Sequence, residues 1–345
     1  HMAPYRGAGR PEAIYVIERM MDIAAARLGI DRVDLRRRNM IRPEDMPHAT
    51  PLGFVYDSGD FPRALDAVLE AADHAGFPAR RAEAATRGRL RGLGIACAIE
   101  PAGGGPGGVQ APEFGALRVT PGAALVLEAG SGDAGQGHAT TFRQIAADLL
   151  GWQGAVQFVT GDTAAIPRGT GTFGSRTMGA VGAALSDSAL QVIEAAAPDA
   201  AEHLEAGPGD IAFERGAFRI VGTDRAVTLE ALAAATGRTY EGEAWVSTEA
   251  STFPNGAHAA EVEIDPETGA LEVVAYHVAD DIGTVINPLL AEGQIHGGVA
   301  QGLGQALMER MVYDEGGALL SGSLMDYAVP RASDLAPISV HHCPT

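Results

Sequence analysis

The spacing of apolar residues predicts that the chain begins with helices. Between Pro11, which suits a first helical turn, and Gly29, which suits a helix end, apolar side chains recur at helical intervals. They are Ile14, Ile17, Met20, Met21, Ala24 and Leu28. Asp31 is suited to cap a short basic helix that runs to Arg38, and Asp60 with Pro62 to begin another that ends near His74.

From Arg91 onward, strand-like and helix-like segments alternate. Runs of alternating or continuous apolar residues, bounded by Gly and Pro, predict strands at 93–99, 114–119, 124–127, 156–160, 211–213 and 218–221. Helices are expected at 138–150, about 178–197, from near Thr228, and at about 292–310. Segments 258–264 and 271–279 are expected to pair around the turn at 265–269. Residues 102–109 form a glycine loop in this interpretation.

This succession predicts an α+β fold with two mixed-sheet subdomains. We expect four consecutive segments: a loop and helical connecting segment at 3–90, a first α+β subdomain at 91–200, a peripheral insertion at 201–242, and a second α+β subdomain at 243–345.

Composition excludes several classes of function. The net charge is −19 and all 25 basic residues are Arg, so the surface is expected to repel nucleic acid. No apolar stretch approaches the roughly 20 residues of a membrane span. Two cysteines, Cys97 and Cys343, cannot form a disulfide framework, which fits a reducing cytoplasm. His1-Met2 is interpreted as a tag remnant at the start of a piece of a longer polypeptide.

The absence of Lys excludes a Schiff base and a phosphate-loop lysine. His341-His342 next to Cys343 is the densest cluster of metal-binding residue types, but no spaced His and Cys set is present, so no protein-ligated metal is expected.

Two glycine-rich segments lead into helices and could hold an anion. Gly135 to Thr141 follows a strand, so backbone N–H groups, small hydroxyls and the helix dipole would face a pyrophosphate. Gly169 to Gly179 repeats the arrangement and adds Arg176, which could pair with a phosphate bidentately. Ordinary turns and helix caps explain either segment alone equally well. Two such helix entries together favour a large phosphate-containing ligand.

A third polar segment, Asp280 to Pro288, ends a strand and is followed by Gln294 on a helix. Neighbouring carboxylates on a strand point to opposite faces, so at most one is expected to face a given site. A helix cap and a solvated turn are the alternative.

The order of motifs resembles the later half of the molybdopterin-binding large subunit of molybdenum hydroxylases, the superfamily of xanthine dehydrogenase, aldehyde oxidase and aerobic carbon monoxide dehydrogenase. Pro4 to Ala13 resembles the molybdenum-site loop. The resemblance continues through Leu28-Gly29, 36–41, 56–60, the GQGH segment, 171–176, 252–258, 280–288, 293–298 and 325–327. It covers nearly the whole chain.

The resemblance implies that Arg6, Gly7, Ala8 and Gly9 border the molybdenum and the substrate. It implies that the cofactor, molybdopterin cytosine dinucleotide, contacts Gln136, Gly137, His138, Thr140, Thr141, Thr172, Ser175, Arg176, Asp281, Asn287 and Gln294. Two subdomains would sandwich it, with the dinucleotide at the helix starts near 138 and 176. The family hydroxylates an electron-poor carbon with oxygen from water, and electrons leave through [2Fe-2S] clusters to FAD on partner subunits or domains.

Three departures from the family pattern shape the expected function. Copper-containing carbon monoxide dehydrogenases carry a Cys where this chain has Gly7, which favours an aldehyde, purine or N-heterocycle as substrate. The family's glutamate base follows the position reached at Thr345, so the general base is absent, and neither Glu12 nor Glu309 replaces it. The family's N-terminal half is also absent.

We therefore expect a partial subunit or excised half that is inactive alone and assembles with a chain or domain supplying that N-terminal half, an iron–sulfur subunit and a flavin subunit. A contiguous apolar patch and some self-association are expected as well. The alternatives are a non-catalytic cofactor-binding or assembly module, and an interaction domain whose glycine motifs are empty.

Overall fold

The computed structural model describes residues 5–103, 112–122, 124–247 and 250–345. The chain divides into two compact units. Unit 1 comprises His1–Pro51, Val55–Glu100 and Phe253–Thr345, and unit 2 comprises Leu52–Phe54 and Pro101–Thr252. Each unit takes strands from distant parts of the chain, which differs from the consecutive segments expected above. Most of the glycine loop at 102–109, together with His1-Met2 and Pro4, lies outside the described residues.

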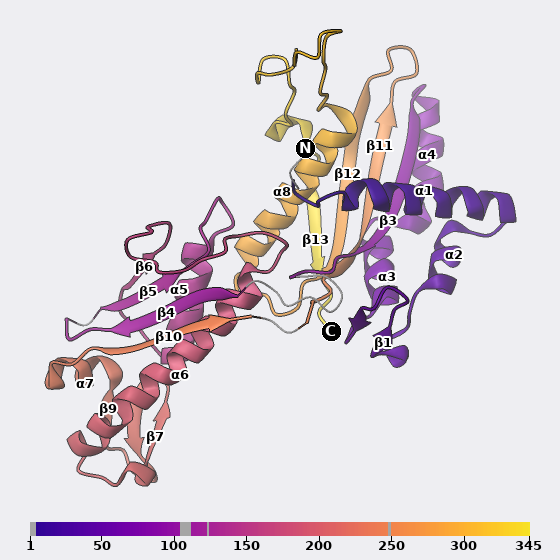
Figure 1. Ribbon diagram of the computed structural model, residues 1–345. Coiled ribbons are helices and arrows are strands. Elements are labelled where there is room, and N and C mark those ends of the chain that lie inside the picture. The colour runs from indigo at the N-terminus through magenta and orange to yellow at the C-terminus, as the bar shows by residue number, and fades with distance from the viewer. Residues whose placement is uncertain (1–4, 104–111, 123, 248–249) are drawn as a thin grey trace. The chain divides into compact units, whose positions relative to one another are not determined.

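Unit 2 is built on a mixed four-stranded sheet with the order β10-β4-β5-β6 (Figure 1). Its strands are β4 (Glu113–Val119), β5 (Leu125–Ala129), β6 (Val156–Val159) and β10 (Tyr240–Val246). β4 is antiparallel to β10 and β5, whereas β6 runs parallel to β5. Helices α5 (His138–Leu150) and α6 (Thr177–His203) join these strands in one apolar core. The structure confirms the mixed α+β fold.

The expected insertion at 201–242 is an extension of unit 2. A three-stranded sheet of β7 (Ile211–Glu214), β8 (Ala217–Ile220) and β9 (Ala226–Thr228) precedes α7 (Leu229–Thr236). Phe218 and Leu232 belong to the same apolar core as α5 and α6. The extension therefore shares the main core of the unit.

Unit 1 is built on a second mixed sheet, with the order β13-β12-β11-β3. Its strands are β3 (Leu90–Ile99), β11 (Asn255–Ile264), β12 (Leu271–Asp281) and β13 (Ile338–His342). The expected antiparallel pairing of β11 with β12 is confirmed, with Ala257 opposite Ala279. Alternate residues of β11 are buried, beginning with Asn255, because one face of the sheet is covered by α3 (Phe61–Ala71) and α4 (Phe77–Thr86).

The remaining elements of unit 1 surround this sheet. They are α1 (Arg10–Leu28), α2 (Arg32–Asn39), a short pair of strands β1 (His48–Ala49) and β2 (Val55–Tyr56), and α8 (Pro288–Leu307). Asp31 and Asp60 cap α2 and α3 as expected, each accepting backbone N–H bonds. The helix expected to end near His74 ends at Ala71, because Asp73 adopts a left-handed conformation with φ of 43° before α4 begins.

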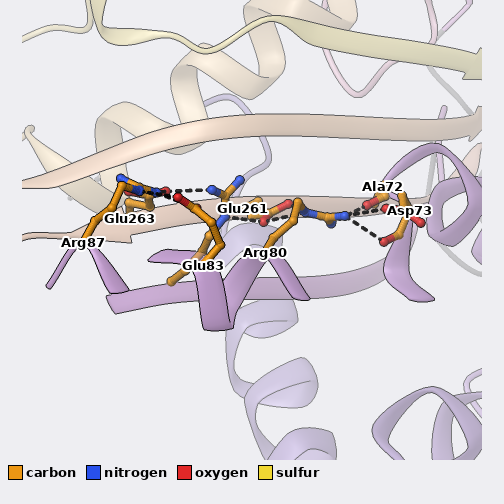
Figure 2. Close-up of polar contacts among 8 residues, drawn as sticks. Ala72, Asp73, Arg80, Glu83, Arg87, Glu261 and Glu263 are labelled. Carbon is orange, nitrogen blue, oxygen red and sulfur yellow. Dashed lines mark hydrogen bonds and ion pairs between the residues drawn. The ribbon is translucent and has the colours of Figure 1, made fainter. Parts of the chain in front are cut away.

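A network of arginines and glutamates fixes α4 to the sheet of unit 1 (Figure 2). Glu261 on β11 is 2% exposed, and it accepts hydrogen bonds from Arg80 of α4 at 3.1 Å and from Arg91 of β3 at 2.5 Å. Glu263 accepts bonds from Arg87 and Arg91, each at 2.7 Å. Burial raises the pKa of Glu261, but the hydrogen bonds from the arginines outweigh this and leave its pKa below the usual value.

Within the described ranges, no helix combines the length and apolar character needed to cross a bilayer. In the same residues, no group of three or more His, Cys, Asp or Glu side chains could hold a metal ion, and this includes the neighbours His341 and His342.

Candidate functional site

The first glycine-rich loop of unit 2 connects β5 to α5 and ends at Gly137, the left-handed N-cap of α5. Asp133 accepts the backbone N–H groups of Gly135 and Gln136, each at 2.9 Å, and that of Gly137 at 3.3 Å. Burial raises the pKa of Asp133, but these backbone hydrogen bonds more than offset it and the pKa lies below the usual range. The sequence analysis assigned the backbone N–H groups of this loop to a bound anion. In the structure, three of them donate to the carboxylate of Asp133 instead.

Two side chains of this segment that were expected to contact a ligand point into unit 2. His138 is buried, with Nδ1 3.1 Å from the carbonyl oxygen of Gly132, and it stacks on Phe142. Thr141 is also buried and donates its hydroxyl to the carbonyl of Gly137 at 3.2 Å. They hold the loop on α5, while Thr140 remains exposed.

Gln136 is half-buried in the same loop. Its Oε1 accepts the backbone N–H of Ala134 at 2.6 Å.

The second glycine-rich loop leads into α6 and contains three left-handed residues, Gly171, Gly174 and Ser175. The sequence assigned the guanidinium of Arg176 to a phosphate, and in the structure it pairs with a carboxylate of the chain. Arg176 is 4% exposed, and its Nη2 lies 2.8 Å from Oε2 of Glu113, which is fully buried. A buried carboxylate requires a counter-charge, so Glu113 draws the arginine inward.

The beginning of α6 is open to a ligand. Its N-cap, Arg176, makes no side-chain capping bond, so the first-turn N–H groups receive no cap from that side chain. The hydroxyl of Thr177 is buried and has no hydrogen-bond partner among the described residues. A Cβ on Gly179 would meet no atom of the described residues within 4 Å. Uncapped amides, an orphaned hydroxyl and open space fit an anionic group here.

The second loop also contacts the first. Thr172 is exposed and donates its hydroxyl to the carbonyl of Gly132 at 2.8 Å. Ser175 is exposed beside the start of α6.

In unit 1, the loop at 5–9 has an unusual backbone. Gly7, Ala8 and Gly9 are all left-handed, with φ of 89°, 49° and 88°. A Cβ on Gly7 would lie 2.7 Å from Cδ of Pro11, so this position excludes a side chain without a backbone shift. The shape of the loop therefore requires glycine at position 7, where the sequence departs from the family pattern.

Helix α8 anchors this loop. The hydroxyl of Tyr5 donates to Oε1 of Gln301 at 2.6 Å, and Arg6 donates to the carbonyl of Gly297 at 3.5 Å. Gln305 donates to Glu12 at 2.9 Å, directly after the loop. Sequence reasoning included Gly297 in the family resemblance but missed Gln301 and Gln305, although the spacing of four places all three on one helical face.

The remaining predicted residues of unit 1 have local partners. Asp281 is 8% exposed and accepts the N–H of Gly283 at 2.9 Å and the hydroxyl of Thr345 at 2.6 Å. Asn287 caps α8 by accepting the N–H of Leu290. Gln294 is exposed on α8. Asp280 lies 3.4 Å from Nε2 of His258, so the neighbouring carboxylates have different surroundings.

Comparison with known families gives two matches. Models of a molybdopterin cofactor-binding domain match residues 67–336 and residues 1–40. The chain is 36% identical to the carbon monoxide dehydrogenase large chain of Hydrogenophaga pseudoflava, over 97% of this chain and 44% of that protein. It is 31% identical to the nicotine 6-hydroxylase large subunit of Paenarthrobacter nicotinovorans, over 100% of this chain and 44% of that protein.

Solved structures agree with these sequence matches. Quinoline 2-oxidoreductase from Pseudomonas putida 86 superposes with a TM-score of 0.88 at 32% identity, covering 99% of this chain and 46% of that chain. A copper- and molybdenum-containing carbon monoxide dehydrogenase superposes with a TM-score of 0.89, also at 32% identity, covering 98% and 45%. The chain thus spans less than half the length of these relatives.

Proposed function

The chain belongs to the molybdopterin cofactor-binding family, and on that premise we propose that it binds a molybdenum-containing molybdopterin dinucleotide as part of a molybdenum hydroxylase. The observation that carries this proposal is the uncapped beginning of α6, with its orphaned Thr177 hydroxyl and the open surface at Gly179. A diphosphate is the part of such a cofactor that a helix N-terminus binds best.

The residues of unit 2 would hold the dinucleotide in two ways. Exposed Thr140, Thr172 and Ser175, with Gln136 and the backbone of Gly137, would contact it directly. Buried His138, Thr141 and Arg176 would instead keep the two loops in shape, as their internal hydrogen bonds indicate.

From unit 1 we propose Asp281, Asn287 and Gln294 as further cofactor contacts, on the basis of the family resemblance. When bound, the cofactor supplies the metal centre at which an electron-poor carbon is hydroxylated with oxygen from water. On the same basis, Arg6 and the backbone of Gly7, Ala8 and Gly9 would line the approach of the substrate, in a loop that is bonded to α8 through Tyr5 and Arg6.

For the substrate we propose an aldehyde, a purine or an N-heterocycle. The relatives named above act on carbon monoxide, nicotine and quinoline. The left-handed Gly7, packed against Pro11, leaves no room for a thiol-bearing side chain in the present backbone, which favours the heterocyclic substrates over carbon monoxide.

The finer assignments follow the family. We propose molybdopterin cytosine dinucleotide as the form of the cofactor, partner chains or domains that carry [2Fe-2S] clusters, FAD and the other half of the molybdenum subunit, and a cytoplasmic location. The general base would then come from outside these 345 residues, and the chain would be inactive alone.

The direct test is cofactor loading. The protein is purified from a host that makes the cytosine dinucleotide cofactor, and molybdenum and released nucleotides are quantified. We expect close to one molybdenum and one cytidine monophosphate per chain. Absence of both, even after coexpression with a homologous N-terminal half, would overturn the proposal. Loading without turnover in that coexpressed complex would favour the non-catalytic cofactor-binding module.

A charge substitution tests the position of the diphosphate. Asp at position 179, in the first turn of α6, favours the helix but repels a phosphate. Gly179→Asp is therefore expected to lower nucleotide retention about tenfold without lowering stability, which corresponds to about 1.4 kcal/mol. Gly179→Asn is the uncharged control of similar size. Equal retention in both variants would place the diphosphate elsewhere.

A further inference from the structure

Glu113, which sequence reasoning did not single out, lies at the base of both glycine-rich loops. It is the first residue of β4 and is fully buried. Its Oε2 accepts hydrogen bonds from the hydroxyl of Ser131 at 2.8 Å, the hydroxyl of Thr170 at 3.1 Å and Nη2 of Arg176 at 2.8 Å. Ser131 belongs to the first loop, and the other two residues belong to the second.

The backbones of the two loops touch beside this carboxylate. A Cβ on Gly130 would lie 2.3 Å from Oε1 of Glu113 and 2.7 Å from the carbonyl oxygen of Arg168. A Cβ on Gly169 would lie 2.4 Å from the carbonyl oxygen of Gly130. The loops approach so closely that only glycine fits at both positions, and Glu113 fills the space between them.

The outer parts of both loops lie on the surface of unit 2. Residues 132–135 and 172–175 are exposed and contribute nothing to the apolar core of unit 2. Among the described residues, the bond between Thr172 and Gly132 joins the two loops directly, and the bonds of Ser131 and Thr170 join them through Glu113. Bonds to an ionised, buried group are stronger and more directional than neutral ones, so this carboxylate can fix both loops.

We propose that Glu113 is the positioning residue of the dinucleotide site, setting both loops against the beginning of α6, and that Arg176 serves the ligand through Glu113. This rests on the proposed function. Arg176 contacts Glu113, the hydroxyl of Thr170 and the ring of Phe173, so its charge is matched within the protein. The ligand would then be bound by loop backbone and exposed hydroxyls whose positions depend on this buried pair.

Glu128 provides a matched control. It is 7% exposed on the neighbouring strand β5, and its carboxylate pairs with Arg118 of β4. Glu113→Gln and Glu128→Gln each remove the charge of a buried glutamate that pairs with an arginine, and both glutamates belong to the same sheet. If these two ion pairs contributed only to the stability of the fold, the two variants would have the same effect on ligand binding.

The test measures binding of cytidine 5′-diphosphate by calorimetry and amide hydrogen exchange in the full chain. For Glu113→Gln we expect at least about tenfold weaker binding, because preorganisation is lost, with faster exchange at 131–137 and 169–175. For Glu128→Gln we expect unchanged affinity and unchanged exchange in the loops. Thr170→Val, which removes one hydroxyl bond to the carboxylate, repeats the measurement if Glu113→Gln does not fold.

Two results would overturn the inference. Unchanged or tighter binding by Glu113→Gln would mean that Arg176 binds phosphate directly once its partner is neutral. Unchanged loop exchange in Glu113→Gln or Thr170→Val would mean that the carboxylate does not hold the loops. If the unmodified chain binds no cytidine diphosphate, the proposed function loses its support, while the exchange data still decide whether Glu113 positions the loops.

Discussion

The two units of this chain are stabilised in different ways. In unit 2, α6 has 11 buried residues, and six of them, among them Val181 and Leu185, belong to one large apolar core shared with α5 and the sheet. In unit 1, α1 buries a single residue, Ala25, and the sheet relies on small side chains such as Ala257 and Ala279. Small side chains remove little apolar area from water, so unit 1 gains less from apolar burial.

Unit 1 compensates with ionic contacts. Arginines of α4 and β3 surround two glutamates of β11 (Figure 2). Unit 2 also contains a buried glutamate–arginine pair, between Glu113 and Arg176, but there the pair lies at the base of the two glycine-rich loops. Pairing of a buried glutamate with arginine therefore contributes to the stability of unit 1 and, in our proposal, to the ligand site of unit 2.

The largest effect is expected from removing the central carboxylate of unit 1. Glu261→Ala leaves Arg80 and Arg91 without their shared partner, and breaking a buried pair in this way costs about 3–5 kcal/mol. Hydrogen exchange of β11 amides should accelerate while α6 amides stay protected. Glu272→Ala, an exposed glutamate on β12, is the control. Equal acceleration in both units would show that they unfold as one.

The corresponding substitution in unit 2 removes apolar volume. Leu185 of α6 is fully buried, so Leu185→Ala is expected to cost about 2–5 kcal/mol. Leu190, on the same helix, is 57% exposed, and Leu190→Ala should change stability by no more than about 0.5 kcal/mol. Denaturant unfolding of both variants measures the difference. A small loss at Leu185 would contradict the view that apolar packing dominates unit 2.

Acid is expected to weaken unit 1 through Glu261. Its pKa in the folded protein lies below the value of about 4.3 in an unfolded chain. The stability from its ionised form is therefore present above pH 4.3 and is lost as the pH falls toward the folded pKa. The stability difference between the unmodified protein and Glu261→Gln should shrink over that window. A difference that is constant with pH would exclude ionisation of Glu261 as its source.

The sequence predicts features that depend on local signals. The bounds of α5 are predicted correctly because Gly137 and Gly151, both left-handed, delimit it. β10 and β13 were not predicted, since each is stabilised by pairing with a strand far away in the chain. Local patterns cannot reveal such pairing.

The same limit applies to the candidate site. The glycine-rich loops were found from their own residues, but Arg176 was assigned to a ligand because its partner Glu113 lies 63 residues earlier. In the sequence, Glu113 directly precedes the strand predicted at 114–119, and a glutamate in that position is usually exposed to solvent. Only the approach of Gly130 to Gly169 brings it between the loops. The residues that we propose as ligand contacts leave local signals in the sequence, whereas the residue that we propose to position them does not.

The smallest change in stability is expected at the apolar side chains of α1. Val16, Ile17 and Met20 are 58%, 61% and 57% exposed, so Ile17→Asp combined with Met20→Asp should alter the free energy of unfolding by no more than about 0.5 kcal/mol for each substitution. Their exposure favours self-association instead, and sedimentation velocity at rising concentration should show less of it in the double variant.

Leu190→Asp on α6 adds a charge at a similarly exposed leucine of unit 2 and serves as the control. If the exposed apolar side chains of α1 mediate self-association, Leu190→Asp self-associates to the same extent as the unmodified protein. A double variant of α1 that unfolds more easily by several kcal/mol would instead mean that α1 is packed in solution. The apolar contribution to unit 1 would then approach that of unit 2, and the contrast between the units would rest on their ionic contacts alone.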